Sequence, residues 1–225
     1  MTGAASTLPG RLLGWLVFSA IVAVGLFGAA GRWDMPALWA LAAIVSGGAL
    51  ACLLALPAGE LSRRHRRGPG DAGLGTTALL RLTGPGSVLF AAADSGRLGW
   101  SGPVPSAFQA AGLALVAGSL ALALRAIVVN RWFTDQLRVQ KEKGHRVVTS
   151  GPYRLVRHPA YAGLLVGHPA AMLAIGSWWA LVGSAIFMAV ILRRTAIEDG
   201  MLLRELDGYA QYAARVRSRL VPGLW

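Results

Sequence analysis

Long apolar runs dominate the pattern of this chain, and two of them are long enough to cross a lipid bilayer. They extend from Leu12 to Ala30 and from Ala37 to Leu56, and neither contains a charged residue. A third run, from Val104 to about Asn130, is interrupted only by Gln109 and Arg125. Because about 20 apolar residues span the hydrocarbon core as a helix, these runs predict three transmembrane helices.

A weaker segment, Thr76 to Ala93, lies between the second and third runs. It contains Arg81 and the triplet Gly84-Pro85-Gly86, which are poor ingredients for an independent transmembrane helix. Arg81 lies near one end of the segment, from which its side chain can reach the membrane interface. The segment predicts a span shielded by neighbouring helices or, as the lesser alternative, a re-entrant loop.

The apolar-rich stretch from Ala160 to Leu192 predicts a helical hairpin. It has Gly176-Ser177-Trp178-Trp179 at its middle, and each half reaches only about 24 Å at 1.5 Å per residue. A tight hairpin with an aromatic interfacial turn fits this length better than one long helix. Gly163 and Gly167 form a G-x-x-x-G pair, which is typical of close helix packing. His168-Pro169 predicts a kink in the first arm, with the imidazole bonded to a freed carbonyl.

Composition supports a membrane protein, because 55% of the residues are hydrophobic and only 14% are charged, against about a quarter in soluble domains. The net charge of +12 does not indicate nucleic-acid binding, since the cations gather in loops beside the spans. These clusters are Arg63, Arg64, Arg66 and Arg67; Arg131, Arg138, Lys141, Lys143, Arg146, Arg154 and Arg157; and Arg193, Arg194, Arg204, Arg215, Arg217 and Arg219.

If all three clusters face the cytoplasm, the spans between them come in even numbers. We therefore predict an all-α polytopic integral membrane protein with six transmembrane helices, or five if Thr76–Ala93 does not cross, and with both termini cytoplasmic. The loop from Gly31 to Pro36 and the segment around Arg97 then face outward. Residues 1–130 form the N-terminal transmembrane helices, about four spans. Residues 131–225 form a cofactor-binding catalytic region of connector, C-terminal helical hairpin and cytosolic amphipathic tail.

The connector ahead of the hairpin gathers rigid and polar residues. Pro152 and Pro159 restrict the backbone and disfavour helix in the residues before them. Arg157, His158 and the flanking Tyr153 and Tyr161 offer a cation, hydrogen-bond donors and aromatic faces, which suit an anionic or aromatic ligand. An interfacial belt that anchors the chain to lipid headgroups remains an equal alternative.

Two adjacent carboxylates, Glu198 and Asp199, follow the last span. On a continuing helix Glu198, Leu202, Glu205, Tyr209 and Tyr212 share one face by i+3 and i+4 spacing, although Gly208 is placed to break that helix. A solvated amphipathic tail paired with arginines is the competing interpretation. Because the hairpin arms are antiparallel and similar in length, we expect the tail to return beside the connector and form one site with it.

The segment from Gly144 to Gly163, with its R-H-P-x-Y-x-G core at Arg157–Gly163, resembles the isoprenylcysteine carboxyl methyltransferase family and its phospholipid N-methyltransferase relatives. The acidic pair with Leu202 and the Gly208–Tyr212 motif resemble the family's acidic pair and its G-x-x-Y-x-x-Y-like tail, and the ending Arg215–Trp225 is similar to bacterial members. The resemblance covers roughly Asn130 to the C-terminus. The family's acidic pair is commonly Glu-Glu, so Asp199 reaches about one methylene less far.

The resemblance implies a membrane methyltransferase that uses S-adenosyl-L-methionine and takes a lipidic substrate from the bilayer. Within it Arg157 is expected to orient an acceptor carboxylate, Glu198 to bind the cofactor's amino group, and Glu198 or Asp199 to accept a proton if the acceptor is an amine. No metal is expected. The cofactor-binding residues that we expect are His145, Val148, Gly151, Tyr153, His158, Pro159, Tyr161, Glu198, Tyr209 and Tyr212.

Two other classes share part of this pattern. Membrane steroid-reductase-like proteins carry a similar G-P-Y-x-x-x-R-H-P-x-Y segment in an NADPH site, and Arg125 within a span is compatible with a transporter or structural protein. The acidic pair and the Y-x-x-Y tail favour methyl transfer. We expect a hydrophobic small-molecule substrate and membrane lipids as partners, with no nucleic acid and no obligate protein partner. The expected location is the bacterial cytoplasmic membrane.

Overall fold

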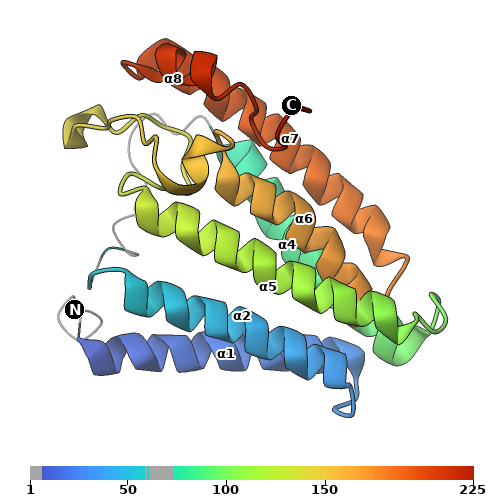
Figure 1. The fold of residues 1–225 in the computed structure, drawn as a ribbon. Coiled ribbons are helices and arrows are strands. Elements are labelled where there is room, and N and C mark those ends of the chain that lie inside the picture. The colour runs from blue at the N-terminus through green and yellow to red at the C-terminus, as the bar shows by residue number, and fades with distance from the viewer. Residues whose placement is uncertain (1–6, 59, 61–72) are drawn as a thin grey trace.

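The computed structural model describes residues 7–58, 60 and 73–225, and within these ranges all regular secondary structure is helical. The helices lie alongside one another in a bundle (Figure 1). They are α1 (Leu8–Ala30), α2 (Pro36–Ala55), α4 (Leu74–Ala93), α5 (Ser106–Val129), α6 (Pro159–Ile175), α7 (Ala180–Glu205) and α8 (Tyr209–Arg215), with a π-helical segment at Asp94–Leu98 and 3-10 turns at Lys141–Lys143 and Gly151–Arg154.

The all-helical membrane fold predicted from the sequence is confirmed. Four helices of the described ranges, α1, α2, α5 and α7, have the length and apolar composition to cross a membrane, and α6 is a shorter apolar helix. Large apolar side chains such as Leu13, Ile21 and Val24 are more than 60% exposed on α1, so this helix has a face suited to lipid. The basic cluster predicted at Arg63–Arg67 lies outside the described residues.

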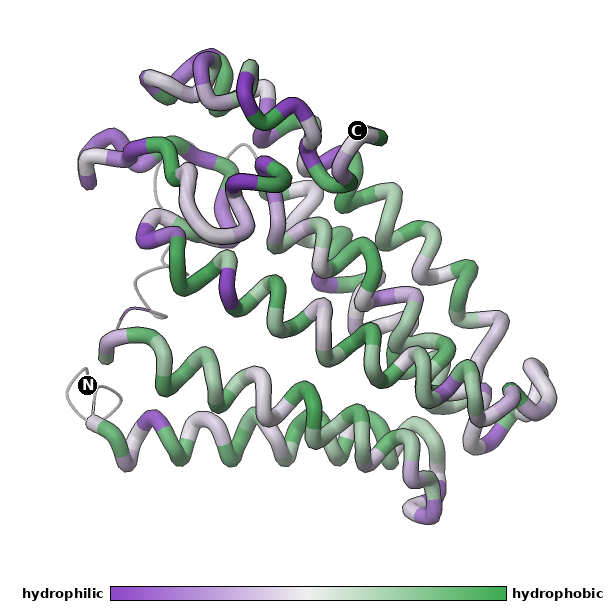
Figure 2. Tube along the Cα trace, in the orientation of Figure 1, coloured by the Kyte–Doolittle hydropathy of each residue, from purple (hydrophilic) through white to green (hydrophobic). Residues whose placement is uncertain are grey.

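The polar segments gather at one end of the bundle. Residues 130–158, α8 and the C-terminal part of α7 lie at the same end as the start of α1, and Figure 2 colours much of this end hydrophilic. The loop at 31–36, the π-helical segment and the turn after α6 lie at the opposite end. This distribution agrees with the predicted parity of the spans; the membrane side that each end faces stays a prediction.

Helix α4 is continuous across the segment that the sequence marked as weak. Pro85 lies inside it, and α4 packs against α7 where both helices carry glycine. A Cβ at Gly84 would lie 3.1 Å from the ring of Phe187, and one at Gly183 would lie 2.9 Å from the Cβ of Ser87. Close packing therefore offsets the low helix propensity. Whether α4 crosses as a sixth span stays a prediction, since it is not among the four apolar helices.

The predicted hairpin is present as α6 and α7, joined by the turn at 176–179. Gly176 ends α6 with a left-handed φ of 96°. At this far end Asp94, fully buried, accepts hydrogen bonds from the hydroxyls of Ser177 (2.5 Å) and Ser101. Ser101 in turn accepts from the backbone N–H of Trp178 at 2.8 Å. The turn is thus tied to the segment that joins α4 and α5.

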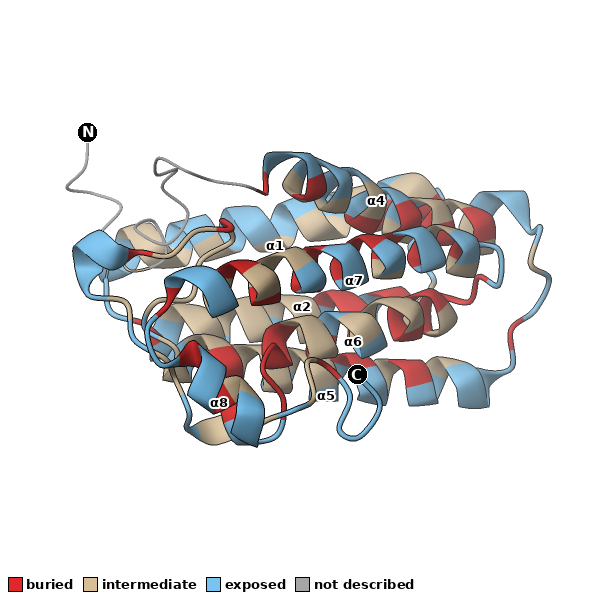
Figure 3. Ribbon diagram, turned by 90° about the horizontal axis from the view of Figure 1, so that it is seen from above, coloured by how far each residue is buried: buried red, intermediate tan, exposed pale blue. Residues whose placement is uncertain are grey.

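Helix α6 packs closely on α5 through the predicted glycine pair. A Cβ at Gly163 would lie 2.8 Å from the carbonyl oxygen of Ser119. A Cβ at Gly167 would lie 2.8 Å from the Cβ of the same serine. His168 bonds to the hydroxyl of Ser184 at 2.9 Å and to the carbonyl of Gly84 at 3.3 Å. Its imidazole therefore joins α6 to α4 and α7, and the carbonyl that it contacts belongs to α4. Gly84, Gly163 and Ser184 are buried, and Ser119, Gly167 and His168 are half-buried. Figure 3 shows buried positions along the helices of the bundle.

Candidate active site

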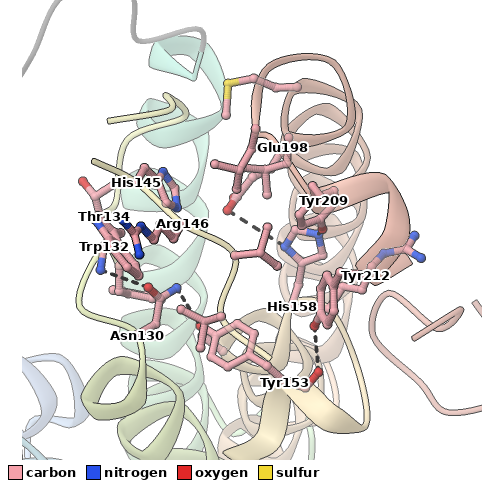
Figure 4. A pocket seen from close by; sticks show the side chains of 18 of the residues that line it. Asn130, Trp132, Thr134, His145, Arg146, Tyr153, His158, Glu198, Tyr209 and Tyr212 are labelled. Carbon is pink, nitrogen blue, oxygen red and sulfur yellow. Dashed lines mark hydrogen bonds and ion pairs between the residues drawn. The ribbon is translucent and has the colours of Figure 1, made fainter. Parts of the chain in front are cut away.

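A pocket opens at the polar end of the bundle, where α5 ends, α6 begins, and α7 meets α8. It contains about 750 Å³ of empty space including its mouth. Figure 4 shows its side chains on two facing walls, with Glu198, His158, Tyr209 and Tyr212 on one and Asn130, Trp132, His145 and Arg146 on the other. The lining residues are Asn130, Trp132, Phe133, Thr134, Gln136, Arg138, His145, Arg146, Val147, Val148, Tyr153, Arg157, His158, Pro159, Ala160, Tyr161, Glu198, Met201, Leu202, Leu206, Tyr209 and Tyr212.

The connector is held in place by the C-terminal segment. The backbone N–H of Arg157 donates to the carbonyl of Ser218 (3.0 Å), and that of His158 donates to the carbonyl of Arg219 (2.9 Å). Pro159 occupies the first turn of α6, where its missing N–H costs no helical hydrogen bond. These contacts fix the backbone at the lip of the pocket.

Asp199 is the centre of a buried polar cluster behind the pocket. Its carboxylate is fully buried and accepts from Nε and Nη2 of Arg157, each at 2.8 Å, from the hydroxyl of Tyr209 at 2.8 Å and from Nε of Arg219 at 2.9 Å. Nε2 of His158 lies 3.1 Å away. A carboxylate engaged by so many groups has little capacity left for a ligand.

The guanidinium of Arg157 also makes most of its hydrogen bonds within the chain. Besides its two bonds to Asp199, its Nη1 donates to the carbonyls of Val216 and Arg217, each at 3.0 Å. Four of the five N–H donors of a guanidinium are thus bonded within the chain. The geometry therefore offers little support for the expected role of Arg157 in orienting an acceptor carboxylate, and favours a role in holding the connector against α7 and the tail.

Glu198 points into the pocket, unlike its neighbour. Its side chain is 26% exposed, and its Oε2 accepts a hydrogen bond from the hydroxyl of Tyr161 at 2.7 Å. The other oxygen lies 3.9 Å from Nδ1 of His158. Glu198 therefore presents a carboxylate with free lone pairs to whatever occupies the pocket.

Three tyrosines close the same wall. Tyr212 donates to the carbonyl of Tyr153 at 2.7 Å, and the hydroxyl of Tyr153 accepts from the amide of Asn130 at 3.1 Å. Burial raises the pKa of Tyr209 and Tyr212 above the ordinary value of 10. Both phenols therefore stay protonated and act as neutral donors.

The opposite wall is aromatic. The rings of Trp132 and His145 stack with their centroids 5.4 Å apart, and the guanidinium of Arg131 lies 4.9 Å over the Trp132 ring. Burial lowers the pKa of His145 to about 4, so its imidazole is neutral at physiological pH. The stacked rings offer a flat aromatic surface beside the pocket, flanked by the cations Arg131 and Arg146, and such a surface suits a planar heterocycle.

Most residues that the sequence suggested come together here. Gly151 and Asp199 do not line the pocket: Gly151, with a φ of 58°, turns the chain against Val129, and Asp199 lies behind the wall. The sequence reasoning missed Asn130, Trp132 and Phe133, although aromatic residues directly after a span, inside a basic stretch, were a usable signal. It also missed Met201 and Leu206, which follow Glu198 by helical spacing.

A second, apolar cavity lies deeper in the bundle, among α1, α2, α4, α5 and α6. It contains about 1360 Å³ of empty space including its openings, and its lining residues include Gly25, Val45, Leu120 and Gly163. On α6 its lining begins at Gly163, three residues after Ala160 of the polar pocket. The two hollows thus come within one helical turn of each other.

Comparison with known proteins gives a consistent result for the part of the chain that forms the polar pocket. Residues 107–206 match the family model described as phospholipid methyltransferase. A probable protein-S-isoprenylcysteine O-methyltransferase of Oryza sativa subsp. indica is 29% identical over 108 residues, 47% of this chain and 56% of the relative. Protein-S-isoprenylcysteine O-methyltransferase B of Arabidopsis thaliana is 30% identical over 112 residues, 46% and 54% of the two chains. The chain thus spans a little over half the length of these relatives.

Fold and pocket together define a helical membrane protein with a polar pocket at one end of its bundle. Within that class, residues 107–206 match the phospholipid methyltransferase family model, and the chain is similar to isoprenylcysteine O-methyltransferases. This confirms the resemblance found in its motifs.

Proposed function

We propose that the protein is a membrane methyltransferase that transfers a methyl group from S-adenosyl-L-methionine to a lipophilic acceptor, most simply a carboxylate. The observation that carries the proposal is the partly exposed Glu198 carboxylate, which faces the stacked rings of Trp132 and His145 across a pocket at the polar end of a membrane bundle. The names of its relatives support the same chemistry.

The pocket residues fit such a cofactor. When bound, S-adenosylmethionine supplies an electrophilic methyl group on a sulfonium. Glu198 would pair with the amino group or the sulfonium, both cationic, and the Trp132–His145 pair would face the adenine. His158, 6% exposed at the connector's end, would bind the cofactor's carboxylate.

The apolar cavity supports a hydrophobic acceptor. Its walls are almost entirely apolar side chains of the membrane helices, so a hydrocarbon chain can move from the bilayer into this cavity without passing through water. With its hydrocarbon chain in this cavity, the acceptor would place its polar head toward Ala160 and Tyr161, at the edge of the cofactor pocket. We infer that the acceptor enters from the bilayer rather than from water.

Methyl transfer to a carboxylate needs no general base, because the nucleophile is already an anion. The chain's contribution is therefore position and exclusion of water. We propose that Arg157 and Asp199 hold the connector, α7 and the tail in register, since both are buried and bonded to each other. Glu198 remains the group placed to accept a proton if the acceptor is an amine.

We further propose that the protein resides in the bacterial cytoplasmic membrane with both termini and the pocket on the cytoplasmic side. The basic residues beside the pocket support this orientation by the positive-inside rule. The start of α1 and the C-terminal helix α8 lie at the same end of the bundle, as the orientation requires (Figure 1).

Labelling distinguishes the candidate functions. Membranes containing the protein, incubated with S-adenosylmethionine carrying an isotopic methyl group, should yield a lipid-soluble product whose label is released by mild base, as expected of a methyl ester. A base-stable label would indicate an amine acceptor. Absence of labelling, together with binding of NADPH by the purified protein, would instead support a reductase and contradict methyl transfer.

A further inference from the structure

Arg194 carries a buried charge that the proposed reaction does not yet use. It lies on α7 one turn before Glu198 and is only 2% exposed. Its guanidinium donates to the hydroxyls of Tyr161 (2.8 Å), Thr76 (3.0 Å) and Thr77 (2.8 Å). It also donates to the carbonyls of Gly73 and Asp135. None of these partners is a carboxylate, and burying a cation without one is costly.

Tyr161 links Arg194 to one carboxylate, that of Glu198. Nε of Arg194 donates to the Tyr161 hydroxyl at 2.8 Å, and that hydroxyl donates to Oε2 of Glu198 at 2.7 Å. A guanidinium only donates hydrogen bonds, so the Tyr161 oxygen must accept from it. The single phenolic proton is then directed toward Glu198.

We propose that Arg194 is a positioning residue, which acts through Tyr161 to hold Glu198 as an oriented carboxylate facing the cationic part of the ligand. The inference rests on the proposed binding of S-adenosylmethionine and adds to it a specific route. Arg194 polarises the Tyr161 hydroxyl and makes it a stronger donor to Glu198. Glu198 consequently keeps one rotamer, with its carboxylate facing the pocket.

A purely mechanical role for Arg194 is the competing explanation. Its bonds to Thr76 and Thr77 hold the start of α4 against α7, and its bond to the Asp135 carbonyl holds the connector against α7. These ties do not pass through Tyr161. Thr77→Val removes one of them and leaves the Arg194–Tyr161–Glu198 route intact, which makes it a matched control.

The test measures the dissociation constant for S-adenosylmethionine by calorimetry on the purified full chain in detergent. Tyr161→Phe keeps the ring and removes the hydroxyl; we expect affinity to fall at least about tenfold, as for loss of a hydrogen bond to a charged group. Arg194→Gln should lose a similar factor, and the double variant should lose no more than Tyr161→Phe alone, within about twofold. Thr77→Val should stay within about twofold of the unmodified protein.

The outcomes separate the claims. If the unmodified protein binds S-adenosylmethionine, two results would overturn the Arg194–Tyr161–Glu198 route and leave the proposed function standing. One is unchanged affinity in Tyr161→Phe, and the other is losses that multiply in the double variant. A loss in Thr77→Val equal to that in Arg194→Gln would assign Arg194 the mechanical role. If Arg194→Gln does not fold, Tyr161→Phe against Thr77→Val decides alone. No binding by the unmodified protein would remove the proposed function and this inference together.

Discussion

At the residue scale, the side chains of Glu198 and Asp199 leave α7 about 100° apart, because an α-helix completes a turn in 3.6 residues. Asp199 consequently enters the cluster of Arg157, Tyr209 and Arg219, while Glu198 faces the pocket. Two neighbouring acids that would repel each other on one surface are thus divided between a buried polar cluster and the wall of the pocket.

This division predicts opposite phenotypes for two nearly isosteric substitutions. Asp199→Asn should lower the free energy of unfolding by about 3 kcal/mol or more, because Arg157 is left buried without its anion. Glu198→Gln should leave thermal stability unchanged and weaken binding of S-adenosylmethionine at least about tenfold. Thermal unfolding and calorimetric titration of both variants in detergent would measure this. A stable, fully binding Glu198→Gln variant would contradict the assignment.

The neutral state of His145 gives a pH dependence with a definite sign. Its pKa is lowered by burial from 6.5 to about 4, so protonation favours the unfolded chain. The stability that this histidine contributes is complete above pH 6.5 and is lost as the pH falls from 6.5 toward 4. His145→Gln, which does not titrate, should therefore show a shallower decline of the unfolding temperature over that interval. Parallel curves for the two proteins would refute this.

The site residues could be predicted from the sequence only in part. The motif at Arg157–Tyr161 and the helical spacing after Glu198 indicated one wall, because spacing along a helix survives folding. Which carboxylate faces the ligand depends on the rotation of α7 against α6 and α8, which no local pattern records. The wall of Trp132 and His145 depends on a loop without periodicity, so its stacking could not be foreseen.

At the element scale, the bundle is held by close contacts between helices that carry small residues. The hairpin of α6 and α7 could be predicted because its length and its Gly176–Trp179 turn are local features. The continuity of α4 could not be predicted, because it depends on close packing against Gly183 of α7, which lies about 100 residues further along the chain.

The α5–α6 contact can be tested by enlarging one glycine. Gly163→Val places a side chain 2.8 Å from the Ser119 carbonyl oxygen, and since backbone cannot yield as a side chain does, we expect a destabilisation of about 1–3 kcal/mol. Gly118→Val on α5 is the control, because a Cβ there meets nothing within 4 Å. Equal unfolding temperatures for the two variants would show that the contact is not close.

At the scale of the whole molecule, a polar pocket and an apolar cavity come within one helical turn of each other along α6. The family match begins at residue 107, whereas the cavity is also bounded by α1 and α2. We therefore propose that α1 and α2 help to hold the acceptor's hydrocarbon chain, although no motif in them indicated it.

Filling the cavity should separate acceptor binding from cofactor binding. Gly25→Phe projects a ring into the cavity from α1, so methylation of long-chain acceptors should fall several-fold while affinity for S-adenosylmethionine stays unchanged. Gly14→Phe, on the same helix in open space, should leave both properties unaltered. Equal activities of the two variants on a long-chain acceptor would argue against the cavity as its site.

Photochemical cross-linking of isotopically labelled S-adenosylmethionine to the purified full chain would show whether the polar pocket holds the methyl donor, as we propose. Saturable label should appear in peptides spanning residues 130–148 or 198–212, and unlabelled S-adenosylmethionine, but not NADPH, should displace it. Label confined to other segments, or displaced by NADPH alone, would contradict the account.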